Sequence, residues 1–256
     1  MFRALRIAVL LFILLFVGLD AWLTQARSTD WDSSLWVKVY PINADGSEKS
    51  HRYIETLTVA EFEGVEEFLR RESARYGKPI SQPIKMKLGE TVKSQPPSID
   101  PEPNMLDVML WSLKMRLWAS DETSDQDNIT PDVRIFLRYH SPEIHLGLEN
   151  SVGIQKGMFG IVNAYAGRPY RGRNNVIIAH EFLHTLGATD KYDPATGQPL
   201  PPDGLADPEL SPLYPQSRAE IMGGRIALSD DDAVIPKSLK HAIIGPLTAR
   251  EIGLSN

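Results

Sequence analysis

The chain has 256 residues, of which 42% are hydrophobic and 23% are charged, a composition typical of one large globular domain or two small ones. A formal net charge of −6 provides no basic surface for phosphate backbones, which excludes a nucleic-acid-binding protein. The absence of cysteine excludes a disulfide scaffold, a thiolate zinc site and a cysteine nucleophile.

The N-terminus has the pattern of an export signal. Arg3 and Arg6 precede an apolar run over residues 7–19, as in a secretory signal. We expect residues 1–27 to be either a cleaved signal peptide or a retained anchor that enters the membrane through residues 7–23. The positive flank places the remainder outside the cytoplasm, so the protein is expected to be membrane-anchored, secreted or periplasmic.

The rest of the chain alternates between strand-like and helix-like patterns. The expected strands are residues 35–40, 84–88, 133–137, 144–148 and 158–164, and the expected helices are residues 58–76, 105–118, 174–186 and 246–252. Thr58 and Glu61 have the spacing of a capping box at the first helix, and Thr248 is the expected cap of the last. The segment 144–148 is short and is expected at a sheet edge.

Two further expectations concern side chains and loops. In the second helix, Trp111 and Trp118 are expected in the core together with Leu113 and Leu117. A stretch at 194–215 is rich in proline, aspartate and glycine and has no periodicity, and loops of that length in compact domains are usually functional.

The order of elements predicts an α+β fold, in which a mixed twisted sheet is packed with helices. Residues 28–256 are expected to form one domain. Its N-terminal subdomain would extend to about residue 187, and a smaller, irregular C-terminal subdomain would occupy residues 188–256.

The segment that begins at His180 carries the chemistry. His180 and His184 are four residues apart in an expected helix, so their imidazoles lie on one face and can bind a single Zn²⁺. Glu181 directly follows the first histidine, where it can reach a metal-bound water as a general base. Burying these polar groups in an apolar helix would be costly unless a metal were bound.

A catalytic zinc site needs a third protein ligand. Gly187 is suited to end the helix in a left-handed conformation, after which Asp190 can turn back toward the metal. Asp190 could instead cap the helix end or bind calcium. Glu209 or Glu220 would be the third ligand in an arrangement like that of thermolysin, which requires the glutamate on a following helix.

The pattern His-Glu-x-x-His-x-x-Gly-x-x-Asp resembles the metzincin clan of zinc metallopeptidases, in the variant with aspartate as third ligand, as in snapalysin-like enzymes and immune inhibitor A-type peptidases. The resemblance implies a metallopeptidase-like catalytic domain with a methionine turn beneath the zinc, for which Met222 is the candidate. Several clan members have a tyrosine two residues after this methionine, where the present chain has Gly224. Tyr192 and Tyr214 are the candidates to replace that tyrosine.

Other acidic residues have less specific roles. Asp193 is a candidate to orient a ligand histidine and is equally suited to a turn before Pro194. Asp203, Asp207 and Glu209 have the chemistry of Ca²⁺ ligands, although such loop residues are more often solvated.

These features predict an exported zinc endopeptidase whose protein or peptide substrate lies extended along a sheet edge, by β-strand addition. Residues 144–148 or 149–157 would form that edge. The alternative is a membrane-anchored interaction or assembly protein with a peptidase-like fold and a structural zinc. The presence of Glu181 favours the peptidase, because a structural site needs no base.

Overall fold

The computed structural model describes residues 6–7, 11–12, 15, 29–78, 80–98, 104–123, 130–145, 147–148 and 151–255. The predicted signal or anchor at residues 7–23 lies almost entirely outside this set. Among the described residues, no helix combines the length and the apolar character needed to cross a membrane.

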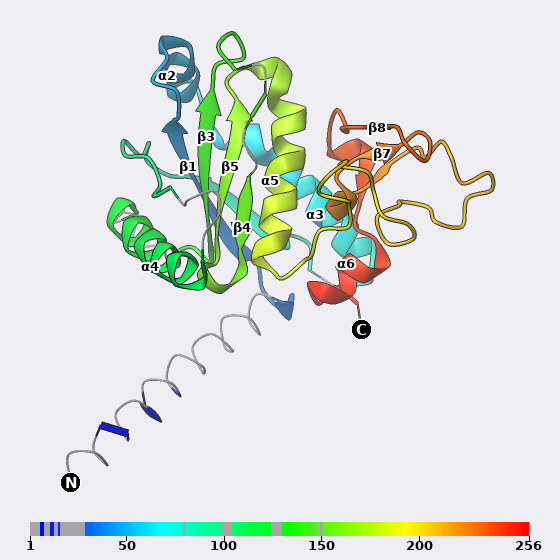
Figure 1. The fold of residues 1–256 in the computed structure, drawn as a ribbon, viewed down its shortest axis with the longest axis horizontal. Coiled ribbons are helices and arrows are strands. Elements are labelled where there is room, and N and C mark those ends of the chain that lie inside the picture. The colour runs from blue at the N-terminus through cyan, green and yellow to red at the C-terminus, as the bar shows by residue number, and fades with distance from the viewer. Residues whose placement is uncertain are drawn as a thin grey trace.

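The described residues form one five-stranded sheet at the centre of the domain, with strand order β2-β1-β3-β5-β4 (Figure 1). Its strands are β1 (Leu35–Asn43), β2 (Ile84–Leu88), β3 (Val133–His140), β4 (Val152–Ile154) and β5 (Phe159–Tyr165). The first four strands in this order run parallel, and β4 pairs antiparallel with β5 at the edge.

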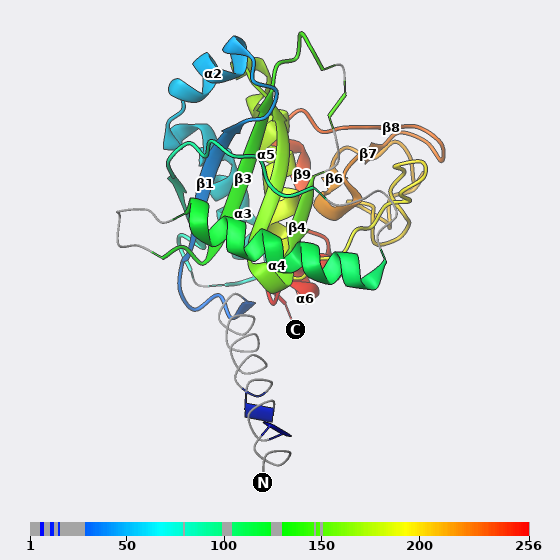
Figure 2. The ribbon, with the colours of Figure 1, turned by 60° about the vertical axis from the view of Figure 1, so that its left-hand side comes forward.

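Helices cover both faces of this sheet. They are α2 (Glu48–Glu55), α3 (Glu63–Arg75), α4 (Met105–Glu122), α5 (Arg171–Thr185) and α6 (Pro246–Glu251), with short 3-10 turns η1 (Val59–Phe62), η2 (Gln155–Gly157) and η3 (Arg168–Tyr170). Helices α3 and α5 lie on one face, and α4 crosses the other (Figures 1 and 2). Because the central strands are enclosed between helices, β1 is buried along most of its length, as expected for parallel strands.

The core has two parts, one on each face of the sheet. The larger part joins the sheet to α3 and α5 and includes Phe68 and Phe182. The smaller part lies under α4, where Met115 packs near Tyr40 and Phe136. The predicted mixed sheet packed with helices is thereby confirmed at the level of architecture.

After α5 the chain is irregular up to α6. It contains only two-residue strands and 3-10 turns, namely β6 (Ala219–Glu220), η4 (Ile221–Gly223), β7 (Ile226–Ala227), β8 (Ala233–Val234), η5 (Leu239–His241) and β9 (Ala242–Ile243). Strand β6 pairs in parallel with β9, and β7 pairs antiparallel with β8. This part lies beside α5 and α3, away from α4 (Figure 1).

Several local predictions were wrong. Helix α2 was not predicted, because it has too few apolar residues to show a clear helical period. Its N-terminus is capped by Ser47, whose side chain accepts a hydrogen bond from the backbone N–H of Ser50. The described residues of 144–148 form no strand, because the N–H groups of Ile144 and His145 bond to the carbonyl of Ser141 in a turn. The sheet edge is β4, which lies inside the alternative stretch 149–157. The side chain of Thr58 caps nothing, since a 3-10 turn precedes α3.

Two further expectations were also wrong. Thr248 does not cap the last helix, which begins at Pro246 after Gly245. Trp111 and Trp118 pack on the smaller core as expected, but Leu113 and Leu117 are exposed to solvent.

Candidate metal centre

Helix α5 brings the two histidines to one place. Its buried side chains, such as Val176 and Phe182, face the sheet and α3, so the helix cannot rotate about its axis. His180 and His184 project from another face with their rings 4.7 Å apart, and both side chains are less than one-fifth exposed.

Asp190 completes a triangle with these histidines. Its Oδ1 atom lies 3.1 Å from Nε2 of His180 and 3.1 Å from Nε2 of His184, and the two Nε2 atoms are themselves 3.1 Å apart. Ligands about 2.0–2.1 Å from a tetrahedral zinc ion are separated by about 3.3 Å. The triangle therefore has the size of one face of a zinc tetrahedron.

The tautomers of the histidines point to the same conclusion. Nδ1 of His180 lies 2.9 Å from the carbonyl oxygen of Ile221, and Nδ1 of His184 lies 2.8 Å from that of Ala188. Since a carbonyl only accepts, each Nδ1 carries a proton, and each ring turns its Nε2 toward Asp190, where that nitrogen can serve as the metal donor. The donor set of two imidazoles and a carboxylate suits Zn²⁺.

Glu181 is buried beside this triangle. Its side chain is 5% exposed, and its Oε2 atom has no hydrogen-bond partner. Burial raises the pKa of Glu181, while the neighbouring His180 and His184 act to lower it. A buried carboxylate oxygen without a partner is costly in a purely structural role, but it can accept a proton from a water at the site.

The edge strand β4 packs closely against this part of α5. A Cβ atom at Gly153 would overlap the backbone oxygen of Glu181 and the Cβ atom of His184. A backbone hydrogen bond from Gly153 also reaches the Glu181 side chain. Glycine at this position therefore allows an edge strand to run directly alongside the candidate metal centre.

The end of α5 directs the chain back toward the histidines. The N–H of Gly187 bonds to the carbonyl of His184, and that of Ala188 bonds to the carbonyl of Leu183, which together form a Schellman motif. Gly187 has a φ of +105°, which side-chain-bearing residues rarely adopt. Asp190 follows three residues later, as the spacing predicts.

Replacing Gly187 with alanine should lower the free energy of unfolding by about 1–3 kcal/mol, because left-handed backbone costs L-residues about 1–2 kcal/mol. The added Cβ would also lie 2.5 Å from Nε2 of Gln155. Urea unfolding of the purified chain measures the loss. Gly147→Ala is the control, since a Cβ there meets no atom within 4 Å. A Gly187→Ala chain as stable as the control would contradict this account of the helix end.

The residues on either side of Asp190 are held by Glu251 of α6. Glu251 accepts hydrogen bonds from the N–H of Thr189 (3.1 Å), from the Thr189 hydroxyl (2.6 Å) and from Nζ of the buried Lys191 (2.7 Å). Although burial acts to raise it, these bonds hold the pKa of Glu251 below its ordinary value. Tyr192 adds a hydrogen bond from its hydroxyl to Asp190. The candidate third ligand is thus fixed by contacts on both sides.

The turn that contains Met222 lies under His180. Met222 is fully buried in the larger core, its carbonyl accepts from the N–H of Lys191 at 2.9 Å, and the adjacent Ile221 carbonyl faces His180. Glu220, which is 0% exposed, shapes this turn. Its carboxylate accepts from four donors: the N–H groups of Met222, Gly223 and Gly245, and the hydroxyl of Thr248.

The other expected residues lie apart from the triangle or have different partners. Both carboxylate oxygens of Glu220 already accept hydrogen bonds, so Glu220 is not placed as a metal ligand. Asp193 accepts from the N–H of Ala195 and so stabilises a turn, and Tyr214 hydrogen-bonds to Asp230. The acidic loop residues Asp203, Asp207 and Glu209 are exposed. Across the described residues, His180, His184 and Asp190 are the sole group of three such side chains close enough to share a metal.

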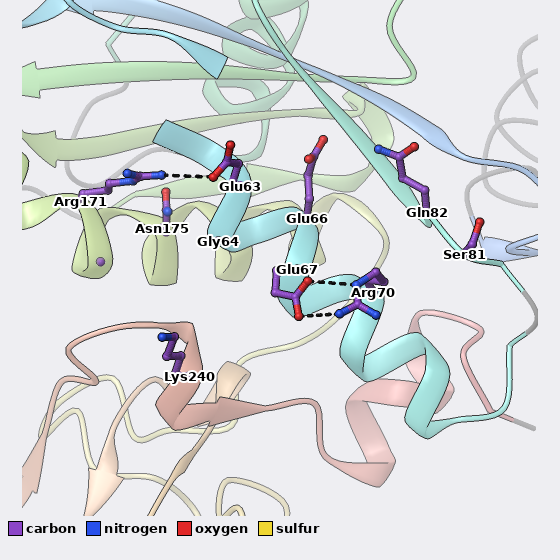
Figure 3. A pocket seen from close by; sticks show the side chains of 11 residues that line it. Glu63, Gly64, Glu66, Glu67, Arg70, Ser81, Gln82, Arg171, Asn175 and Lys240 are labelled. Carbon is purple, nitrogen blue, oxygen red and sulfur yellow. Dashed lines mark hydrogen bonds and ion pairs between the residues drawn. The ribbon is translucent and has the colours of Figure 1, made fainter. Parts of the chain in front are cut away.

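A further hollow of the surface lies away from these residues. A cavity of about 950 Å³ lies between α3, the first turns of α5 and η5, and the metal-site residues do not line it (Figure 3). Its charges are largely paired, as Glu67 with Arg70 at 2.6 Å and Arg171 with Glu63 at 4.0 Å.

Sequence reasoning missed Glu251 and Lys191 entirely, and it considered Glu220 only as a ligand. No local signal marks them, because their hydrogen-bond partners are distant in the sequence. Glu251 bonds to residues 60 and 62 positions away, and Glu220 bonds to Gly245, which is 25 positions away.

No protein-family model matches this chain, and no curated protein matches it. Among solved structures, a chain from "Structure of a chaperone-substrate complex" matches with a TM-score of 0.41 and 14% sequence identity. The match covers 86% of the present chain and 34% of the other, so the present chain spans about a third of that length. A likeness this distant supports no conclusion about function.

Proposed function

We propose that this protein is an exported zinc-dependent endopeptidase of metzincin type. The observation that carries the proposal is the triangle of Nε2 atoms and Oδ1 in His180, His184 and Asp190, with the buried, unpartnered oxygen of Glu181 beside it. A structural zinc site requires the triangle but has no use for a buried carboxylate oxygen without a partner.

Zn²⁺ bound at such a triangle lowers the pKa of a bound water toward about 7 and polarises a substrate carbonyl. Glu181 would take a proton from the attacking water and deliver it to the leaving amine nitrogen. Its raised pKa suits the first half of this transfer, because a carboxylate with a pKa nearer the working pH is a stronger base toward the attacking water.

The edge strand supplies the binding surface. Strand β4 pairs with β5 on one side, and it lies against Glu181 and His184 through Gly153. An extended peptide that adds to β4 would run past the metal with a scissile carbonyl near Glu181. This favours residues 152–154 as the substrate edge.

Two features bear on the metzincin assignment. The buried methionine turn at Met222 supports it, since it touches His180 and Lys191 through backbone carbonyls. Gly224, with φ +74°, offers no tyrosine for the transition state. Tyr192, whose hydroxyl reaches Asp190, is the proposed replacement.

Metal content and cleavage of an unfolded protein test the proposal together. We expect the purified full chain to hold about one zinc by elemental analysis and to cleave casein. A chelator should abolish cleavage, and added zinc should restore it. His184→Ala should lose both zinc and activity, whereas the exposed His241→Ala should keep both. A full chain that is folded yet binds no zinc would refute the metal centre, and one that binds zinc but cleaves no protein or peptide substrate would favour a structural zinc in an interaction protein.

A further inference from the structure

Helix α4 presents an apolar stripe to solvent. Five large apolar side chains on it are between 53% and 64% exposed, namely Leu106, Met109, Leu110, Leu113 and Leu117. Their spacing of three, four, seven and eleven residues from the first places them on one side of the helix. A contiguous apolar surface of this kind usually marks an interaction site.

The opposite side of α4 is already occupied by the core. Met115 and Ala119 are buried against the sheet. The indole N–H of Trp111 donates to the carbonyl of Pro97 at 2.8 Å, and that of Trp118 donates to the hydroxyl of Ser94 at 2.6 Å. These contacts fix the rotation of α4, so the stripe cannot turn inward.

The stripe lies at the end of the domain where the chain enters it. Thr123, just after α4, accepts a hydrogen bond from Nε of Arg134 at the start of β3. Trp36 at the start of β1 bonds to Asp132, immediately before β3. Both views show α4 across the half of the sheet where β1 begins (Figures 1 and 2).

The distance from the predicted anchor to the domain is short. Trp31 is 2% exposed, and its indole N–H donates to the carbonyl of Ile252 at 2.7 Å, so this residue is fixed to the folded domain. Only seven residues separate Leu23, the end of the predicted anchor, from Trp31. Even fully extended they reach about 25 Å, which keeps the domain next to the bilayer.

We propose that residues 7–23 are retained as a membrane anchor and that the apolar stripe of α4 inserts into the interface of the same bilayer. Amphipathic helices bind there with their apolar face about 5–10 Å deep. Asp107, Asp121 and Glu122 on α4 offset Lys114 and Arg116. Insertion therefore depends on apolar contact and not on anionic lipid. The second contact would hold the domain in one orientation on the membrane.

Because the chain has no cysteine, single labels can test this contact in the full-length protein. Leu113→Cys carries an environment-sensitive nitrobenzoxadiazole label, and Ser211→Cys, at an exposed position between α5 and β6, is the matched control. The loop between α5 and β6 lies on the side of the domain away from α4 (Figure 1). Each protein is reconstituted in phosphatidylcholine vesicles that contain lipids spin-labelled along the acyl chain.

We expect the label at residue 113 to emit at shorter wavelength than that at 211 and to be quenched several-fold more strongly by the lipids. Equal, weak quenching at both positions would overturn the proposal, as would failure of the full chain to remain with the vesicles. A blue shift at residue 113 that lacks lipid quenching and grows with protein density would overturn it in favour of a second copy on the stripe.

Discussion

Replacing Glu181 with glutamine is expected to leave zinc bound while casein cleavage falls by roughly 10²–10⁴-fold, the usual contribution of a general base. Glutamine has nearly the same shape as glutamate but cannot take a proton from water. The three proposed metal donors are His180, His184 and Asp190, so the site itself should survive. Zinc content by elemental analysis and initial cleavage rates measure the two effects separately.

Glu90→Gln is the matched control for this substitution, because Glu90 is exposed and the chemical change is identical. It should retain full zinc content and full activity. A Glu181→Gln protein that cleaves as fast as the control would remove Glu181 from the mechanism. Loss of zinc along with activity would assign it to holding the site and not to proton transfer.

Replacing Glu220 with alanine is expected to lower the free energy of unfolding by about 4–5 kcal/mol, since each buried donor left unsatisfied costs about 1–3 kcal/mol. Four donors lose their acceptor in this substitution: the N–H groups of Met222, Gly223 and Gly245, and the Thr248 hydroxyl. This carboxylate, together with the pairing of β6 with β9, joins the turn under His180 to the start of α6. Urea unfolding of the metal-free and zinc-bound protein measures the change.

Zinc affinity should fall together with stability in the Glu220→Ala protein, by about 10–100-fold, because the Ile221 carbonyl that orients His180 loses its support. Glu209→Ala removes an exposed carboxylate from the same part of the chain and should change neither quantity by more than about 0.5 kcal/mol. A loss of stability below about 1 kcal/mol in Glu220→Ala would show that water or other groups replace the carboxylate.

Local patterns determined most of the sheet and the position of the candidate centre. Strands β1, β2, β3 and β5 and helix α5 follow from hydrophobic runs and periodicity within a few residues. The convergence of His180 and His184 follows from helix geometry alone. Asp190 lies beside them because Gly187 ends the helix in a left-handed conformation that turns the chain back. These are short-range effects, which depend on neighbours one to six residues away.

Long-range contacts decided the rest. The sequence left the edge open between residues 144–148 and 149–157, and the structure places β4, inside the second stretch, at the edge. Gly153 lets this strand approach Glu181 and His184 once α5 is in place, whereas the start of 144–148 folds into a turn. Glu220 and Glu251 look like ordinary surface carboxylates in the sequence, yet the folded chain brings backbone N–H groups and Lys191 from remote segments onto them. Such pairs depend on loop closure across tens of residues, which composition and periodicity do not encode.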